Sequence, residues 1–340
     1  AKRGLQPRPE AARDIWLRRV YLDLIGLAPT PEQRTVFLKD TSATAHERVV
    51  DALLAHPAYG ERWGRHWMDV WRYSDWAGYK QSLRESQRHI WHWRDWIVEA
   101  LNADKTYDRI ILEMLAADEA MPENTKALRA TGYLARHYFH KRDQWMDDVV
   151  KHTSQAFMGV TLACARCHDH KHDAFPQEDY YALRAVFAPY HVRTDRVPGV
   201  LDVTKNGLPR AFDNSLNAKV YLFKRGDERY PVKDAVITPG IPEFLGGKLD
   251  IQPVSLPPSA VQPDQRAFVK KDLLADAQKK VTDAKEDPAR KVAQLELDAL
   301  EAEFKTETLT KDTEEWKTAA KTTLKLQRTA KLAAAKLKLT

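Results

Sequence analysis

Apolar residues recur every three or four positions along most of the first 190 residues, and this spacing predicts helices. The clearest amphipathic segment runs from Pro9 to Ile25. Thr30-Pro31 marks the start of another helix, and Thr44 with Glu47 matches the pattern of a capping box. Because almost nothing alternates with period two, residues 1–190 are predicted to form an all-α domain. Its further helices are expected at 60–74, 89–102, 106–117, 124–136, 143–163 and 177–188.

The pattern changes twice after this domain. Residues 191–262 hold frequent prolines and one clear strand candidate, Ala218–Phe223, so an extended Pro-rich linker or strap with little strand is expected. Residues 263–340 are rich in Ala, Lys, Glu and Leu, and they carry an amphipathic stripe that includes Leu297. They predict a helical hairpin or coiled-coil arm that is divided at Asp287-Pro288. The predicted fold class is therefore mainly α.

Composition and charge exclude several classes of protein. The chain has 340 residues, 43% of them apolar, and no run of 18 apolar residues, so no transmembrane segment is predicted. A net charge of +6 is modest and weakly clustered, which argues against nucleic acid as a partner. The chain begins at Ala1 without a signal peptide, as expected of a processed or trimmed product.

The two cysteines of the chain carry the strongest chemical signal. They lie in Cys164-Ala165-Arg166-Cys167-His168, which is the C-x-x-C-H attachment signature of a c-type haem. Both thiols would bond to the porphyrin, and His168 would ligate the iron from one side. Arg166 is long enough to reach a haem propionate. One haem c is therefore predicted, and because it is attached outside the cytoplasm, the protein is expected in the periplasm or otherwise exported.

Other interpretations of the same residues stay open. Cys164 and Cys167 could form a local disulfide or a redox dithiol, or they could bind zinc together with His170 and His172. If a haem is attached, these two histidines are too close in sequence to His168 to reach the opposite face easily. We expect them to hold propionates or neighbouring backbone.

The tryptophans give a second hint about function. Trp63, Trp67 and Trp71 repeat at i, i+4 and i+8 and so form one stripe of a helix. They predict either an aromatic core between two helices or a flat apolar wall for a porphyrin.

The second axial ligand of the iron has two candidates. His66 is preferred because it lies among these tryptophans, and His152, in the helix that leads to the cysteines, is the alternative. Met158 is typical of core packing.

Several blocks of sequence together resemble the planctomycete-type cytochrome c family. They are Arg18–Leu27, Tyr59–Val70, Trp93–Ile97 and Gly159–Lys171. A later stretch, Arg225–Pro242, resembles the linker of those proteins and contains an expected tight turn at Arg225-Gly226-Asp227. The resemblance implies export and haem binding, and it links the chain to an envelope complex in polysaccharide metabolism. It also implies further domains before and after this region.

Three functions of different classes follow. The first is electron transfer to a redox partner protein, and the second is a haem-dependent oxidoreductase that acts on a small or carbohydrate substrate. The third is an interaction subunit with a structural haem or zinc. The arm at 263–340 favours a protein partner in each case. For the oxidoreductase, the candidate polar pocket residues are Asp69, Asp75, Arg94, Asp95 and Asp118.

Overall fold

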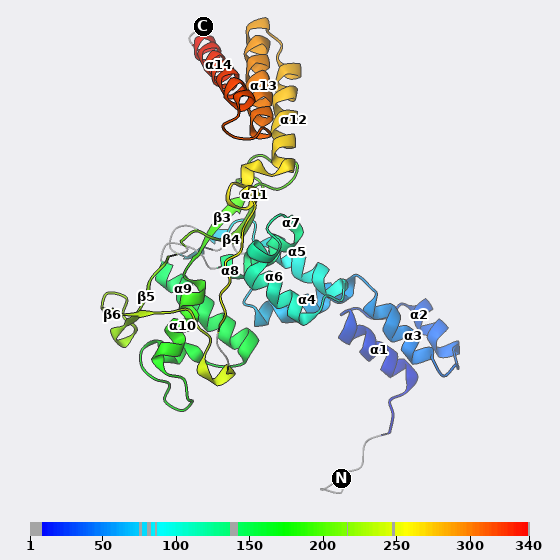
Figure 1. Cartoon of the computed structure of the whole chain (residues 1–340). Coiled ribbons are helices and arrows are strands. Elements are labelled where there is room, and N and C mark those ends of the chain that lie inside the picture. Colours follow the sequence, from blue (N-terminus) through cyan, green and yellow to red (C-terminus); the bar gives the residue numbers. More distant parts are fainter. Residues whose placement is uncertain are drawn as a thin grey trace. The chain divides into compact units, whose positions relative to one another are not determined.

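The structure is a computed structural model of the chain, and it describes residues 9–74, 77–79, 83–85, 87–136, 142–215, 217–246 and 249–338 (Figure 1). Helices dominate these residues, which confirms the mainly α fold class. The chain divides into two compact units. Unit 1 holds residues 1–193 and 209–254, and unit 2 holds residues 194–208 and 255–340.

Three short helices at the start of unit 1 share a small apolar cluster. They are α1 (Arg13–Leu24), α2 (Pro31–Lys39) and α3 (Ala45–Leu54), and their cluster consists of Leu17, Tyr21, Ile25, Phe37, Ala45 and Leu53. α2 begins at Thr30-Pro31 as predicted, and Thr30 and Gln33 exchange the two hydrogen bonds of a complete capping box. The box predicted at Thr44 is wrong. Thr44 precedes α3, but its side chain makes no capping hydrogen bond.

The main core of unit 1 forms where aromatic side chains from several helices meet. The helices are α4 (Ala58–Val70), α5 (Trp91–Asn102), α6 (Tyr107–Ala120), α8 (Gly132–Ala135), α9 (Arg142–Thr153) and α10 (Gln177–Phe187). The short α7 (Thr125–Leu128) lies between α6 and α8 in the chain and adds no residue to this core. Most of these helices lie close to the predicted segments, although the segment 124–136 is divided between α7 and α8. The predicted helix at 143–163 is wrong in its second half, because α9 ends at Thr153 and a π-helical turn, Ser154–Met158, follows it. The largest buried rings of this core are Trp71, Trp93, Trp96, Trp145, Tyr133, Tyr180 and Tyr181.

Short two-stranded ribbons interrupt the helices. β1 (Ala77–Tyr79) pairs with β2 (Leu83–Glu85), β3 (Tyr190–Asp195) with β4 (Leu208–Asp213), and β5 (Val220–Phe223) with β6 (Pro231–Ile237). β5 lies within the predicted strand, but the other five were not anticipated. A ribbon of two short strands buries no continuous face, so its sequence shows little period-two alternation. Residues 191–262 therefore contain more strand than their prolines indicated.

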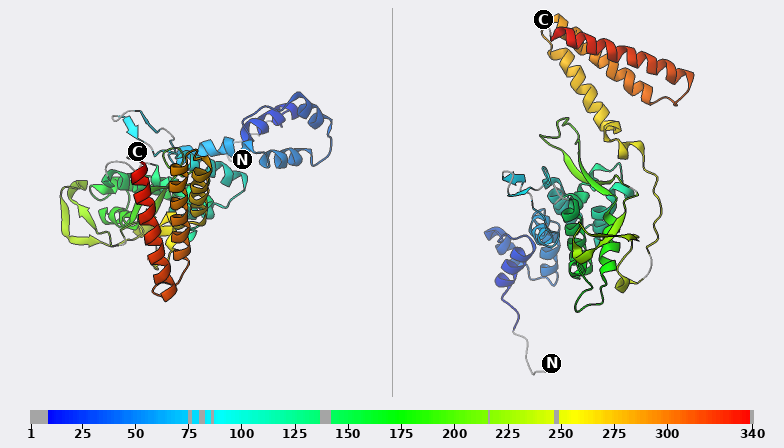
Figure 2. Two further views of the ribbon diagram at one scale, coloured as in Figure 1. Left: turned by 90° about the horizontal axis from the view of Figure 1, so that it is seen from above. Right: turned by 90° about the vertical axis from the view of Figure 1, so that its left-hand side faces the viewer.

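Unit 2 is built from α11 (Pro258–Val261), α12 (Ala267–Asp283), α13 (Asp287–Glu307) and α14 (Glu314–Leu337). α13 begins at the predicted division, and α13 and α14 run side by side as an antiparallel hairpin (Figure 2). A buried ion pair of 3.3 Å joins Arg266 to Asp195, so the segment 194–208 is tied to the first turn of α12. No helix among the described residues has the length and apolar content that a membrane span needs.

The crossing of α4 and α5 depends on one glycine. A Cβ at Gly60 would lie 2.5 Å from the carbonyl oxygen of Val98 and 2.7 Å from the side chain of Asn102. The Gly60 N–H donates to Asn102 Oδ1 at 2.8 Å, which fixes the two helices at this short separation. A Cβ at Gly64, one turn along, would meet nothing closer than 3.3 Å.

Gly60→Ala is therefore expected to destabilise the protein by about 2 kcal/mol more than Gly64→Ala, because only the first change forces the helices apart. Both substitutions gain similar helix propensity, about 1 kcal/mol, so their difference reports the crowding alone. The free energy of unfolding from urea titrations measures it. Equal values for the two variants would contradict the prediction.

Candidate functional site

Cys164 lies on the exposed face of a short 3-10 helix, η3 (Leu162–Arg166), and Cys167 follows directly as the C-cap residue of this helix. Leu162 and Ala165 are fully buried, whereas Cys164 and Cys167 are exposed free thiols. A 3-10 helix has about three residues per turn, so residues three apart share a face. The spacing of the motif therefore places both thiols on the outer face while the residues between and before them anchor η3 in the core.

His168 follows η3 and is exposed to solvent. Its Nδ1 lies 2.6 Å from the carbonyl oxygen of Asp169. When Nδ1 carries the proton, it donates to this carbonyl, and the lone pair of the ring lies at Nε2. Histidines that bind metals commonly have one ring nitrogen anchored in this way. The carboxylate of Asp169 accepts the N–H of Gln177 at 2.8 Å, which connects the motif to the start of α10.

The Arg166 side chain is held by an ion-pair network. Its guanidinium lies 3.0 Å from Asp147 of α9, and Asp147 also accepts the Tyr180 hydroxyl at 2.5 Å and pairs with Arg184. Burial and then the charge of Asp147 raise the pKa of Tyr180, so the phenol stays protonated and donates. The Arg166 carbonyl accepts the Tyr181 hydroxyl at 3.1 Å. Because these tyrosines lie on α10, the network fixes η3 to α9 and α10 together.

A turn distant in sequence closes against Cys167. This turn, η4 (Lys224–Gly226), joins β5 to β6, and both Arg225 and Gly226 adopt a left-handed backbone with φ of +54° and +70°. A Cβ at Gly226 would lie 2.6 Å from Cys167 Sγ, so only glycine lets the turn approach the sulfur this closely. The Arg-Gly-Asp sequence therefore forms the turn that was expected, and it borders the motif.

His170 stabilises the loop that follows it. Its Nδ1 accepts backbone N–H groups from Asp173 at 2.9 Å and from His172 at 3.3 Å, and its ring packs edge-on against Phe175 with 5.5 Å between centroids. Within the described ranges, no three His, Cys, Asp or Glu side chains are gathered as metal ligands. The four residues considered for a zinc site are thus not assembled in this structure.

Trp63, His66 and Trp67 all lie on α4. Trp63 is 36% exposed, and its ring lies 5.5 Å from that of His66, which is also exposed. Trp67 stacks on Trp71 with 4.9 Å between centroids and packs against the main core. α4 packs against α5 and α1, whereas η3 packs against α9 and α10. The tryptophan stripe and the cysteines therefore belong to different groups of helices.

His152, the alternative ligand, lies on the helix that borders the motif. Its side chain is 12% exposed, and its Nε2 lies 4.0 Å from the carboxylate of Asp148. Asp148 follows Asp147, the partner of Arg166, and α9 packs directly against η3.

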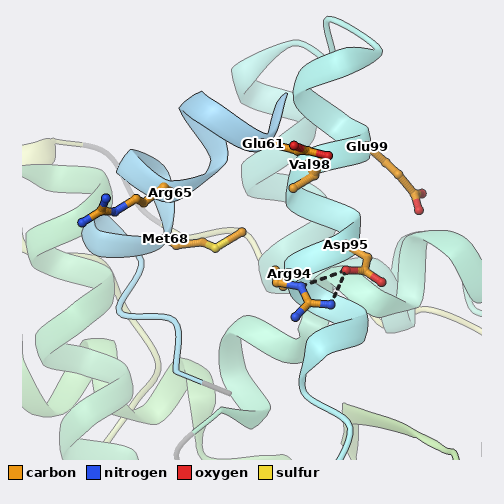
Figure 3. Close-up of a pocket in the computed structure, with 7 residues that line it drawn as sticks. All are labelled: Glu61, Arg65, Met68, Arg94, Asp95, Val98 and Glu99. Carbon is orange, nitrogen blue, oxygen red and sulfur yellow. Dashed lines mark hydrogen bonds and ion pairs between the residues drawn. The ribbon is translucent and has the colours of Figure 1, made fainter. Parts of the chain in front are cut away.

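A groove of about 540 Å³ lies between α4 and α5, and Figure 3 shows the seven residues that line it. Two of the five polar candidates, Arg94 and Asp95, pair at its edge with 2.9 Å between them, and Met68 extends into it from α4. Arg65 and Glu61 from α4 add one charge of each sign. The groove therefore presents paired opposite charges beside an apolar patch.

The other polar candidates are not in this groove. Asp69 is an exposed residue of α4, and Asp75 lies outside the described residues. Asp118 is 4% exposed, and burial, followed by the charge of Asp213, raises the pKa of Asp118 to about 7. Of the four candidates that the structure describes, Arg94 and Asp95 lie together at the groove, whereas Asp69 and Asp118 do not line it.

Sequence reasoning missed Asp147, Tyr180 and Gly226 as parts of the site. Gly226 had a signal, because it lies in a block that resembles the family linker. No signal in the sequence marked Asp147. Its partner Arg184 is 37 positions away, and the two side chains meet only because α9 packs against α10.

Comparison with known proteins gives one match. The model of the PSCyt2 family, described as a protein of unknown function (DUF1549), matches residues 1–192, more than half of the chain. The matched range includes the C-x-x-C-H motif but not the turn at Gly226. No curated protein and no solved structure matches.

Gly226→Ala is expected to destabilise the protein by about 1–3 kcal/mol more than Gly159→Ala, because overpacking against Cys167 adds to the backbone strain. Gly159 is the matched control, since its φ is also positive, at +69°, and a Cβ there would meet nothing within 4 Å. Unfolding by urea measures both. Removing the sulfur as well, in Gly226→Ala with Cys167→Ala, should recover the difference; if it does not, the contact with Cys167 is not the cause.

Proposed function

The chain belongs to the PSCyt2 family, a family of unknown function, and we propose that it is an exported c-type cytochrome with one covalently attached haem that transfers electrons. One observation carries the proposal. η3 and its C-cap residue carry two exposed free thiols three positions apart, and the histidine that follows them has its Nδ1 anchored to backbone.

Each residue of the site has a defined task in this proposal. Cys164 and Cys167 would hold the haem covalently, and His168 Nε2 would ligate the iron on one face. When bound, the haem supplies a one-electron couple between ferric and ferrous iron. The Asp169 carbonyl would orient the His168 ring. Asp147 fixes Arg166 and with it the geometry of η3 between the two thiols.

As the second histidine that would hold the iron, we propose His152 rather than His66. His152 is nearly buried on α9, which packs on η3, whereas His66 is exposed on α4 beside Trp63. A bis-histidine haem has no open coordination position, and this suits electron transfer rather than substrate binding.

Export and partners follow from the same proposal. Attachment of haem c takes place outside the cytoplasm, so the protein would act in the periplasm or a comparable compartment. Electron transfer requires a redox partner protein. The hairpin of α13 and α14 carries exposed Leu324 and Leu332, which supports a protein contact through the arm.

The groove between α4 and α5 supports a second candidate function, a haem-dependent oxidoreductase. Arg94 and Asp95 at its edge could hydrogen-bond a polar substrate such as a carbohydrate, with Met68 against an apolar face. An open iron position in the haem-loaded protein would favour this function over electron transfer.

The intact mass of the denatured protein is expected to exceed the polypeptide mass by one haem. Attachment should weaken in Cys167→Ser and in Cys164→Ser, because each thiol supplies one of the two covalent bonds. Gly159→Ala is a control, since it lies near the motif and contributes no ligand. A haem-free protein that binds one equivalent of zinc would overturn the proposal.

Replacing His152 with alanine is expected to convert a low-spin haem spectrum to a high-spin one and to open the iron to carbon monoxide. His66→Ala is the matched variant and should leave the spectrum low-spin. The reverse result would return the assignment to His66. A high-spin spectrum in the unaltered protein would favour the oxidoreductase instead.

A further inference from the structure

Arg136 is a buried cation with unsatisfied hydrogen-bond donors. Its side chain is only 2% exposed, and one nitrogen, Nη1, donates to the carbonyl of Tyr133. The other two, Nε and Nη2, are buried and have no hydrogen-bond partner. In the described part of the chain, no carboxylate lies within ion-pair distance of this guanidinium. Because an unpaired buried charge is strongly destabilising, such a residue indicates a missing acceptor.

The surroundings of Arg136 add a further donor, while the side chain of Tyr133 supplies one interaction that favours the charged form. The guanidinium carbon lies 4.1 Å from the ring centroid of Tyr133 and 5.9 Å from that of Trp93. The indole N–H of Trp93, a residue 1% exposed, also has no hydrogen-bond partner. Burial lowers the pKa of Arg136, but a guanidinium stays charged at physiological pH. Ring faces offset part of this charge but accept no N–H bond in the plane of the guanidinium.

These donors lie close to the helix that borders the cysteine motif. The charge of Asp148 acts on Arg136 from beyond ion-pair distance, and Asp148 is adjacent to Asp147, the partner of Arg166. The Tyr133 ring lies 5.3 Å from that of Phe157, seven positions before the first cysteine of the motif. Arg136 is therefore linked, through the Tyr133 ring and the charge of Asp148, to α9 and to the turn that follows it, and α9 packs against η3.

We propose that Arg136 and Trp93 form a buried carboxylate-binding site and that its carboxylate is a haem propionate, an inference that rests on the proposed function. A carboxylate offers two oxygens that match the fork of a guanidinium, and a third lone pair can accept the indole N–H. Arg166, the residue between the thiols, is already paired with Asp147 and keeps one buried nitrogen, Nε, without a hydrogen bond, whereas Arg136 has two such nitrogens and no carboxylate at ion-pair distance among the described residues.

The test uses the full-length, haem-loaded protein, after the intact mass has shown that each variant carries haem. Arg136→Gln removes the charge, Arg136→Lys keeps the charge without the fork, and Trp93→Phe keeps the ring without the N–H. The propionate bending band in the resonance Raman spectrum should shift in all three. The reduction potential should fall only in Arg136→Gln, with a change of about tenfold in the reduction equilibrium, or about 59 mV for one electron, because a nearby cation favours the ferrous state.

Arg210→Gln is the matched control, because Arg210 is also 2% exposed but lies beside Asp118 in another part of unit 1. It should reduce stability and leave both haem signals unchanged. Haem-loaded Arg136 and Trp93 variants with an unshifted propionate band would overturn the proposal while leaving the haem itself in place. If added sodium propionate raises the thermal midpoint of the unaltered protein but not of Arg136→Gln, the site binds a free carboxylate and the haem assignment is wrong.

Discussion

The carboxylate of Asp147 joins the three segments that position the cysteine motif. It lies on α9, it accepts hydrogen bonds from Tyr180 and Arg184 of α10, and it pairs with Arg166 of η3. A mostly buried carboxylate is stable only with several donors, so each partner is needed in its place. The position of η3 therefore depends on this ion-pair network as well as on the buried Leu162.

The short helix η3 determines how the cysteine side chains and the following histidine are oriented. Since its inner face is buried, its outer face has to carry the cysteines, and the histidine that follows is directed by the backbone of the next residue. The turn at Gly226 then borders Cys167 from outside the range that matches the family. The site thus combines residues of the family region with a glycine of the β5–β6 ribbon, and comparison of the family region alone does not reveal it.

Two arginines near the motif have opposite electrostatic environments. Arg166 has a carboxylate partner at 3.0 Å, whereas Arg136 has aromatic faces and nitrogens without acceptors. Burial of Arg166 beside its carboxylate partner therefore costs less folding free energy than burial of Arg136, whose charge lacks such a partner. A ligand that brings a carboxylate to Arg136 would stabilise the folded protein, and in this way binding and stability would be coupled at one residue.

The amino-acid sequence determined the features that depend on neighbours along the chain. These include the helix boundaries near Thr30 and Asp287, the mainly α class and the C-x-x-C-H spacing, because capping, periodicity and covalent geometry act over a few residues. Only the tertiary structure decided which residues meet across helices. Asp147 with Arg184, and Gly226 with Cys167, are far apart in the chain, so no local pattern marks them. Likewise the exposure of His66 and the burial of Arg136 follow from which helix faces pack together, which the sequence pattern leaves open.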